Sequence, residues 1–250
     1  MNASKLKQKL EKKYPYRIEL HAHTRPHSNC GEAEPEKLVE IYKGKGYDGI
    51  VLTNHFMGYN KRKDGEYMPG ETKEERLEFY LSGYRETKAF GDKAGVKVYL
   101  GAEIRFSKEN ENDYLIYGMD EETLANCYDN FREDLATFRK NVDLSKSVFV
   151  QAHPFRDGME RINPELLDGV ETFNMHPGHN QRAGFVCRYA KENDLKIRTV
   201  GSDFHHLDRG HEGVSALRTK VLPKDSFHLA EILKSGDYLF EIGETALVMP

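Results

Sequence analysis

Short runs of β-branched and other apolar residues recur along the chain, and charged or amphipathic stretches separate them. Runs of this kind, bounded by glycine and polar residues, are typical of buried β-strands. We predict seven strands, at residues 17–21, 49–53, 97–102, 113–118, 148–152, 169–173 and 197–201.

Helical patterns lie between several of these strands. Residues 35–46 begin with a proline and end at glycines, as helices often do. Residues 73–95 and 180–194 also have a helical pattern, and so has the stretch 224–238, which short extended pieces follow. Alternation of strands and helices predicts an α/β fold with a parallel sheet, either open or closed into a barrel.

The composition is that of a globular protein, with 38% hydrophobic and 31% charged residues in a chain of 250. That length fits one large α/β domain or two small ones. No stretch has the pattern of a separate domain, so we expect a single domain over residues 1–250. The net charge of −4 gives no overall attraction to nucleic acid or an anionic membrane. An extended nucleic-acid partner would need several basic contacts and is not expected, although a short single-stranded end would still fit.

The sequence favours a cytoplasmic protein. Its first residues lack the apolar core of a signal peptide, and no apolar run reaches the length of about 18 residues that a membrane helix needs. The cysteines, Cys30, Cys127 and Cys187, are odd in number and far apart, so a disulfide framework is not expected.

Histidines and carboxylates gather where the predicted strands end. They are His21 and His23 after the first strand, His55 after the second, Glu103 after the third, His153 after the fifth, Asn174 and His176 after the sixth, and Asp203 and His205 after the seventh. The carboxyl ends of parallel strands open on one side of an α/β fold, so we expect these side chains to lie together.

Imidazoles and carboxylates without thiolates suit Zn²⁺, Mn²⁺ or Fe²⁺, whereas a set of oxygens alone would suit Mg²⁺. The candidate donors exceed what one tetrahedral ion needs, so we predict a cluster of two or three divalent ions. Glu103 is the candidate bridge, because a carboxylate between two close cations partly neutralises both.

In order along the chain, the segments HAH, TNH, GAE, AHP and SDFH resemble the motifs of the PHP family, named for polymerase and histidinol phosphatase domains. The match runs from residue 17 to about residue 206. The resemblance implies a distorted seven-stranded, TIM-like (β/α)7 barrel with a trinuclear metal site that hydrolyses phosphate esters. It also implies ligands for the first ion (His21, His23, Glu103 and Asp203), the second (Glu103 and His153) and the third (His55 and His205).

The chain departs from the family pattern in two places. Many members carry Asp or His in the loop after the first motif, whereas Cys30, His27 or Glu32 would have to complete the third site here. A histidine is also common just before the fourth strand, where this chain has Asp113. Asp113 is either an oxygen ligand of the second ion or an acid at the edge of the strand.

The mechanism that follows is attack on phosphorus by a hydroxide whose pKa the metals lower. Arg25, Arg156 and Arg182 are candidates to hold the phosphate, because a guanidinium matches its geometry, and Arg156 in HPFR is the best placed. His176 is our candidate general acid, with His179 and His206 as other candidates for this role or for support of the ligands.

We therefore predict a metal-dependent phosphoesterase that acts on a small phosphomonoester, either similar to histidinol phosphate or a nucleotide. An exonuclease acting on a nucleic-acid end, an amidohydrolase-type enzyme that cleaves C–N bonds and a non-catalytic PHP module are the alternatives. No mid-chain lysine stands at a strand end as a bridging ligand, which disfavours the amidohydrolase. The charged segment 60–76 is either a lid over the site or a solvated insertion.

Overall fold

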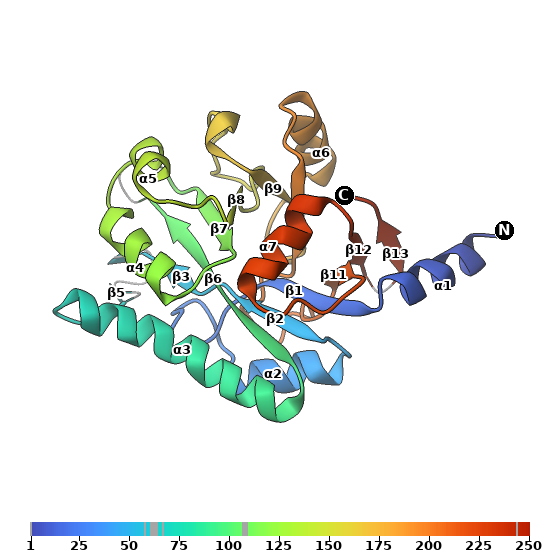
Figure 1. Cartoon of the computed structure of the whole chain (residues 1–250), viewed down its shortest axis with the longest axis horizontal. Coiled ribbons are helices and arrows are strands. Elements are labelled where there is room, and N and C mark those ends of the chain that lie inside the picture. The colour runs from blue at the N-terminus through green and yellow to red at the C-terminus, as the bar shows by residue number, and fades with distance from the viewer. Residues whose placement is uncertain (1, 58, 61–64, 67, 107–109, 244) are drawn as a thin grey trace.

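The computed structural model describes residues 2–57, 59–60, 65–66, 68–106, 110–243 and 245–250, and it confirms the predicted α/β fold. Its main feature is a strongly curved sheet with the order β10–β9–β8–β7–β6–β2–β1–β11–β12–β13, which the short β3 joins beside β6 (Figure 1). The strands of this sheet are β1 (Tyr16–Ala22), β2 (Gly49–Leu52), β3 (His55–Phe56), β6 (Lys97–Arg105), β7 (Asp113–Tyr117), β8 (Val148–Gln151), β9 (Gly169–Asn174), β10 (Ile197–Gly201), β11 (Ser215–Thr219), β12 (Leu239–Ile242) and β13 (Ala246–Val248).

All seven predicted strands are present, but the prediction of a parallel sheet is wrong for β7. This strand pairs antiparallel with both β6 and β8. The connection from β6 to β7 spans only residues 106–112, which is too short for the crossover that parallel pairing needs. Because β7 is reversed, its first residue, Asp113, lies at the edge where the parallel strands end, opposite Arg105 of β6.

The sheet curls until β10 comes close to β1. The first part of β1 pairs with β11, whereas its end meets the segment that follows β10. There His23 N–H donates to the Phe204 carbonyl, and Phe204 N–H donates to the His21 carbonyl. Closure as a seven-stranded barrel is not confirmed, because the described sheet continues from β1 into the antiparallel strands β11, β12 and β13.

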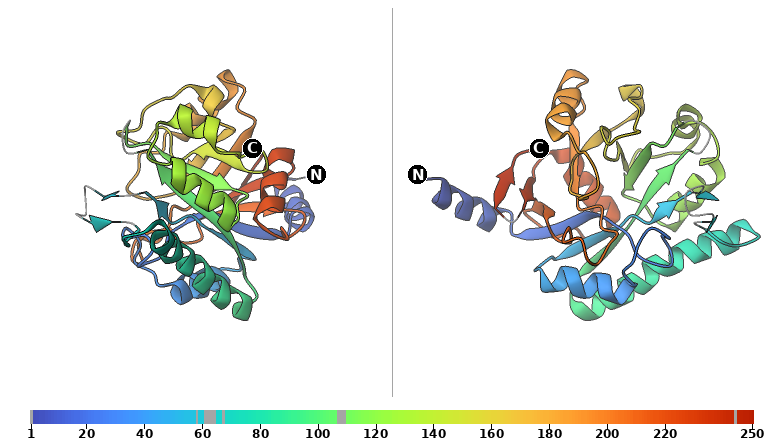
Figure 2. Two further views of the ribbon diagram at one scale, coloured as in Figure 1. Left: turned by 60° about the vertical axis from the view of Figure 1, so that its left-hand side comes forward. Right: turned by 180° about the vertical axis from the view of Figure 1, so that it is seen from behind.

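Helices flank the curled sheet, except α1 (Ala3–Lys13), which projects away from it at the N-terminus (Figures 1 and 2). The predicted ones are α2 (Pro35–Gly44), α3 (Lys73–Ala94), α6 (Ala183–Glu192) and α7 (Ser226–Ser235), and the sequence patterns missed α1, α4 (Glu121–Asn130), α5 (Leu135–Asn141) and the 3-10 turn η1 (Pro164–Leu166). Asp120 and Asp134 cap α4 and α5 by accepting from backbone N–H groups, a start signal that could have revealed both helices. Among the described helices none is both long and apolar enough to cross a lipid bilayer.

Helix α7 covers one end of the curl. Its Leu229 and Leu233 belong to the apolar cluster that the strands enclose. The Ser226 hydroxyl donates to the Leu100 carbonyl near the start of β6 and accepts from the Gly118 N–H just beyond β7. The parallel strands begin and β7 ends at this edge, so α7 lies opposite the edge that carries the histidines and carboxylates.

A short antiparallel pair, β4 (Tyr59–Asn60) with β5 (Gly65–Glu66), lies in the charged segment 60–76. Residues 61–64 and 67 of this segment lie outside the described residues, so its role as a lid stays a prediction. The segment runs into α3, which begins with a capping box formed by Thr72 and Glu75.

We expect Gly169→Ala to destabilise the fold. Gly169 pairs with both β8 and β10, and a Cβ there would lie only 2.0 Å from the Ile197 carbonyl oxygen. Overpacking of this kind costs about 1–3 kcal/mol, which a shift in the midpoint of urea unfolding would measure. Gly184→Ala is the control, since a methyl group added at this position of α6 would meet nothing within 4 Å beyond the backbone of its own helix. Equal stability of the two variants would contradict the expected clash.

Candidate metal centre

Glu103 is the central carboxylate of the candidate site. It lies within β6, two residues before the strand ends, and pairs in register with His55 of β3. Its carboxylate oxygens face four imidazoles, with distances of 3.5 Å to His21 Nε2, 3.3 Å to His23 Nε2, 3.0 Å to His55 Nδ1 and 3.2 Å to His153 Nε2. A single buried carboxylate thus gathers ligand candidates from several strand ends.

Asp203 is the second such carboxylate and comes from the segment after β10. Its Oδ1 lies 3.4 Å from His21 Nε2, 3.6 Å from His23 Nε2 and 3.3 Å from His205 Nε2. Its φ of 51° and the φ of 29° at His153 fall in the left-handed region, which is costly for residues other than glycine. Strain of this kind gathers at functional sites, where the surrounding structure enforces it.

Several of these atoms are buried and have no hydrogen-bond partner among the described residues. They are Nε2 of His21, His23 and His205, Oε2 of Glu103 and Oδ1 of Asp203. An unsatisfied buried polar atom costs about 1–3 kcal/mol, and these converge on the same space. Imidazole nitrogens and carboxylate oxygens gathered in this way fit divalent cations, which would satisfy them together.

The pKa shifts of the buried carboxylates and of His21 also favour cations in the site. Burial, reinforced by the charge of Asp113, raises the pKa of Glu103 to about 8. Burial alone would raise the pKa of Asp203 as well, but the neighbouring His21 and His205 hold it well below its usual range. Burial disfavours a charged His21, yet Asp203, Glu171 and Glu103 raise its pKa well above the ordinary value.

Glu171 of β9 orients the first ligand and was missed from the sequence. Its Oε1 lies 2.9 Å from His21 Nδ1, which leaves the opposite nitrogen of His21 facing Glu103 and Asp203. Its Oε2 accepts from the His153 backbone N–H at 3.0 Å and from the Asn174 amide at 2.9 Å. The signal was a carboxylate among uncharged residues of a buried strand, because a buried carboxylate requires buried partners.

Glu19 of β1 carries the same signal and fixes the backbone behind the ligands. It is fully buried, and its Oε1 accepts from the N–H groups of His21 and Ser202. Its Oε2 accepts from the hydroxyl of Tyr42 in α2. Glu19 thus joins the end of β1 to the segment after β10, so that the first and last predicted ligands meet.

Asp113 lies inside the site, but its carboxylate faces arginines. Arg105 donates to both oxygens, from Nε at 2.6 Å and from Nη2 at 2.7 Å, and Arg156 Nη2 lies 3.4 Å from Oδ2. His153 Nε2 is 3.7 Å from the same oxygen. Asp113 is also close enough to His55 and Glu103 to share an ion with them. It is therefore buried in the cluster, and Arg105, two residues after Glu103 on the same face of β6, is a neighbour that the sequence reading overlooked.

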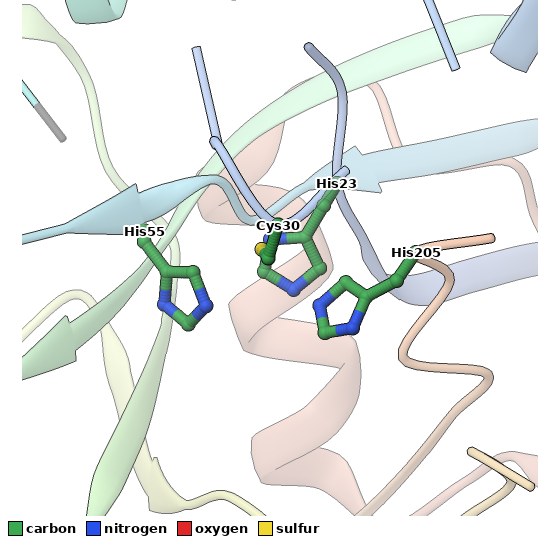
Figure 3. A group of neighbouring side chains, drawn as sticks. All are labelled: His23, Cys30, His55 and His205. Atoms are coloured by element: carbon green, nitrogen blue, oxygen red, sulfur yellow. The ribbon is translucent and has the colours of Figure 1, made fainter. Parts of the chain in front are cut away.

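The loop after β1 brings a sulfur to the site. Donor atoms of His23, Cys30, His55 and His205 all lie within 4.8 Å of one another, and Figure 3 shows their side chains around one space. The other two candidates from this loop point elsewhere. His27 is buried against α3, where its Nε2 lies 3.1 Å from Ser82 Oγ, and Glu32 contacts His206 at 2.8 Å.

Of the three predicted phosphate-binding arginines, only Arg156 lies beside the cluster. Arg25 pairs with the exposed Glu34 at 3.0 Å. Arg182 donates to Asp157 and to the Phe155 carbonyl. The proline and phenylalanine after His153 form a turn in which Arg156 N–H donates to the His153 carbonyl, and this turn brings the guanidinium back toward Asp113.

Further histidines line one side of the site. His176, the candidate general acid, stacks on His179 with ring centroids 4.0 Å apart, and burial lowers its pKa to about 3. Its Nδ1 accepts from the Gly178 N–H, and its role as general acid stays a prediction. His179 Nδ1 lies 3.3 Å from Asp203 Oδ2. His211, which the sequence did not single out, accepts from the His205 N–H.

Comparisons with known proteins agree with this fold. One similar solved structure is named as a metal-dependent phosphoesterase from Bifidobacterium adolescentis, with 17% identity and a TM-score of 0.54 over 87% of this chain and 95% of that one. Another is a two-domain protein from Bacteroides vulgatus with a PHP-like metal-dependent phosphoesterase, with 14% identity and a TM-score of 0.63 over 93% of this chain and 66% of that one. The expected likeness to the PHP family is thus confirmed at the level of the fold.

An amidohydrolase from Chromobacterium violaceum, solved with bound sulfate and no metal, is also similar, with 15% identity and a TM-score of 0.50 over 78% of this chain and 89% of that one. No family model matches the sequence, and neither does any curated protein. The neighbours therefore show the fold of this chain.

We expect Glu171→Gln to weaken metal binding. The change removes the charge that fixes His21, and loss of such a supporting group typically costs about 10–100-fold in metal affinity. Competition of the purified protein with a chromophoric chelator for Zn²⁺ measures the affinity. The exposed Glu165→Gln is the matched control and should bind as the unaltered protein does. Unchanged affinity in Glu171→Gln would show that this contact does not tune the ligand.

Proposed function

We propose that this chain is a metal-dependent phosphoesterase that hydrolyses a small phosphomonoester, either similar to histidinol phosphate or a nucleotide. The observation that carries the proposal is the convergence of buried, unpartnered imidazole and carboxylate atoms beside the guanidinium groups of Arg105 and Arg156. The first set of groups suits divalent cations and the guanidinium of Arg156 suits an anionic substrate, and a phosphate ester requires both.

Two or three ions, Zn²⁺, Mn²⁺ or Fe²⁺, would be held by the groups already described. The first would take His21, His23, Glu103 and Asp203, the second Glu103, Asp113 and His153, and the third His55 and His205. When bound, such ions neutralise charge on phosphoryl oxygens and make water a stronger nucleophile.

The chain's own groups then bind and orient the substrate. Arg156 Nη2 makes a long contact of 3.4 Å with Asp113 Oδ2. This contact leaves other donors of the guanidinium for a phosphate oxygen. Arg105 holds Asp113 in place through two short hydrogen bonds. His176 as general acid stays a prediction, and its neighbour His179, which contacts Asp203, is the better placed histidine to move a proton at the substrate.

An amidohydrolase-type C–N hydrolase is the second candidate. The observation in its favour is the shared fold of the Chromobacterium violaceum amidohydrolase. The carboxylate of Glu103 stands at the centre of the site, and two arginines beside it favour a doubly charged phosphate over a neutral amide. An exonuclease acting on a nucleic-acid end and a non-catalytic PHP module are further outcomes of the tests below.

Hydrolysis should depend on both the metal and His23. We expect chelated protein to be inactive, Mn²⁺ to restore hydrolysis of a generic phosphomonoester, and refilled His23→Ala to lose it, because His23 lies between Glu103 and Asp203. A phosphodiester and an anilide assayed side by side separate the nuclease and amidohydrolase alternatives. Turnover of neither phosphate ester by metal-loaded protein would overturn the proposal.

Arg156→Ala should impair binding of a phosphomonoester more than it impairs metal loading. Loss of one hydrogen bond to a charged group costs about 1.5–3 kcal/mol, which corresponds to roughly a 10–100-fold rise in KM. Steady-state kinetics with matched metal content give the measurement. Arg188→Ala on the exposed face of α6, where Arg188 contacts only Glu192 in the described structure, is the control. A rise in KM of the same size in both variants would exclude a specific role for Arg156.

A further inference from the structure

We propose that Cys30 binds the third ion as a thiolate, so that this ion is held by one sulfur and the imidazoles of His55 and His205. The inference rests on the multi-ion site of the proposed function and adds a ligand of a different chemical class to it. The donor atoms of the three residues lie within 4.8 Å of one another and of His23 (Figure 3). Each comes from a different part of the chain. Cys30 lies in the loop after β1, His55 lies in β3, and His205 lies in the segment after β10.

His23 borders the same space but belongs to the first ion. It is fully buried, and its Nε2, which has no hydrogen-bond partner among the described residues, lies 3.3 Å from Glu103 Oε2 and 3.6 Å from Asp203 Oδ1. Its Nδ1 is occupied by Ser28 Oγ at 3.2 Å. One imidazole nitrogen binds one ion. His23 would therefore bind the first ion, and its ring lies beside the position of the third ion.

Ser28 organises the loop around this third position. Its buried hydroxyl lies 3.2 Å from His23 Nδ1 and 3.3 Å from Cys30 Sγ, and it accepts from the His55 backbone N–H at 3.2 Å. A single hydroxyl thus contacts three candidate ligand residues, two in the segment after β1 and one in β3. Supporting contacts of this kind are what holds metal ligands in place in established sites.

The backbone of the loop is fixed as well. Ser28 N–H donates to the Thr24 carbonyl, and Gly31 N–H donates to the Ser28 carbonyl. Glu32 N–H donates to the His205 carbonyl at 2.8 Å, which ties the loop directly to another ligand of the third ion. Cys30 is therefore carried by a turn with defined contacts at both ends.

A thiolate changes which metal this position prefers. Sulfur is a soft donor and favours Zn²⁺, Fe²⁺ or Co²⁺, whereas Mn²⁺ and Mg²⁺ prefer oxygen. Three protein ligands leave a fourth place for substrate, as in catalytic rather than closed structural zinc sites. The third position would thus take a softer ion than the position between Glu103, Asp113 and His153, where oxygen donors are more numerous.

Titration of the metal-free, full-length protein with Co²⁺ tests the proposal. We expect the near-ultraviolet charge-transfer band of a cobalt thiolate in the unaltered protein and in Cys187→Ser, whose cysteine is exposed. Cys30→Ser should lose the band while it still binds Co²⁺, and circular dichroism should show that it is folded. Cys30→Asp should bind the third ion without the band. No band in the unaltered protein, or a band that persists in folded Cys30→Ser, would overturn the proposal.

Alkylation gives a second readout that does not depend on turnover. Bound Zn²⁺ should protect Cys30 from iodoacetamide, as mass spectrometry of the digested protein would show, whereas Cys187 should react with or without Zn²⁺. Equal labelling of Cys30 in both states would contradict its role as a ligand. A thiolate band without hydrolysis of any phosphate ester would reject the proposed function alone, and hydrolysis without the band would reject only the thiolate.

Discussion

The constraint on which the site depends is the burial of the Glu103 carboxylate inside the curled sheet. A carboxylate in such a place is costly unless hydrogen bonds or cations compensate it. Here imidazoles from β1, β3 and the turn after β8 surround it at 3.0–3.5 Å, and Asp203 brings a second carboxylate to the same space. The two buried carboxylates, and the donor atoms that have no hydrogen-bond partner among the described residues, together favour the binding of cations.

Around this centre, other groups of the protein hold three of the ligand candidates. Glu171 fixes His21, Ser28 fixes His23, and the His205 backbone is held by His211 and by the loop that carries Cys30. These supports come from strands and loops far apart in sequence. Groups that orient metal ligands in this way are typical of metal sites.

Seven strands, and the histidines and carboxylates that gather at their ends, could be identified from the sequence, because apolar runs and the residues that end them are local features. The reversal of β7 could not, since strand direction is set by the length and path of the connection from Arg105 to Asp113. Arg105 and Glu171 were missed for a related reason, because each is defined by a partner on another strand. The choice among Cys30, His27 and Glu32 depended on how one loop turns, which spacing alone does not determine.

The pairing of His21 with Asp203 has a consequence for how the protein is made. These residues stand near opposite ends of the motif-bearing chain, and the bond from Glu32 to the His205 carbonyl joins the same two regions. During synthesis the early histidines leave the ribosome long before their partners do, and contacts so distant in sequence form late. The candidate ligands can therefore come together only after the strands up to β10 have been translated, so any metal would meet the complete set late in synthesis.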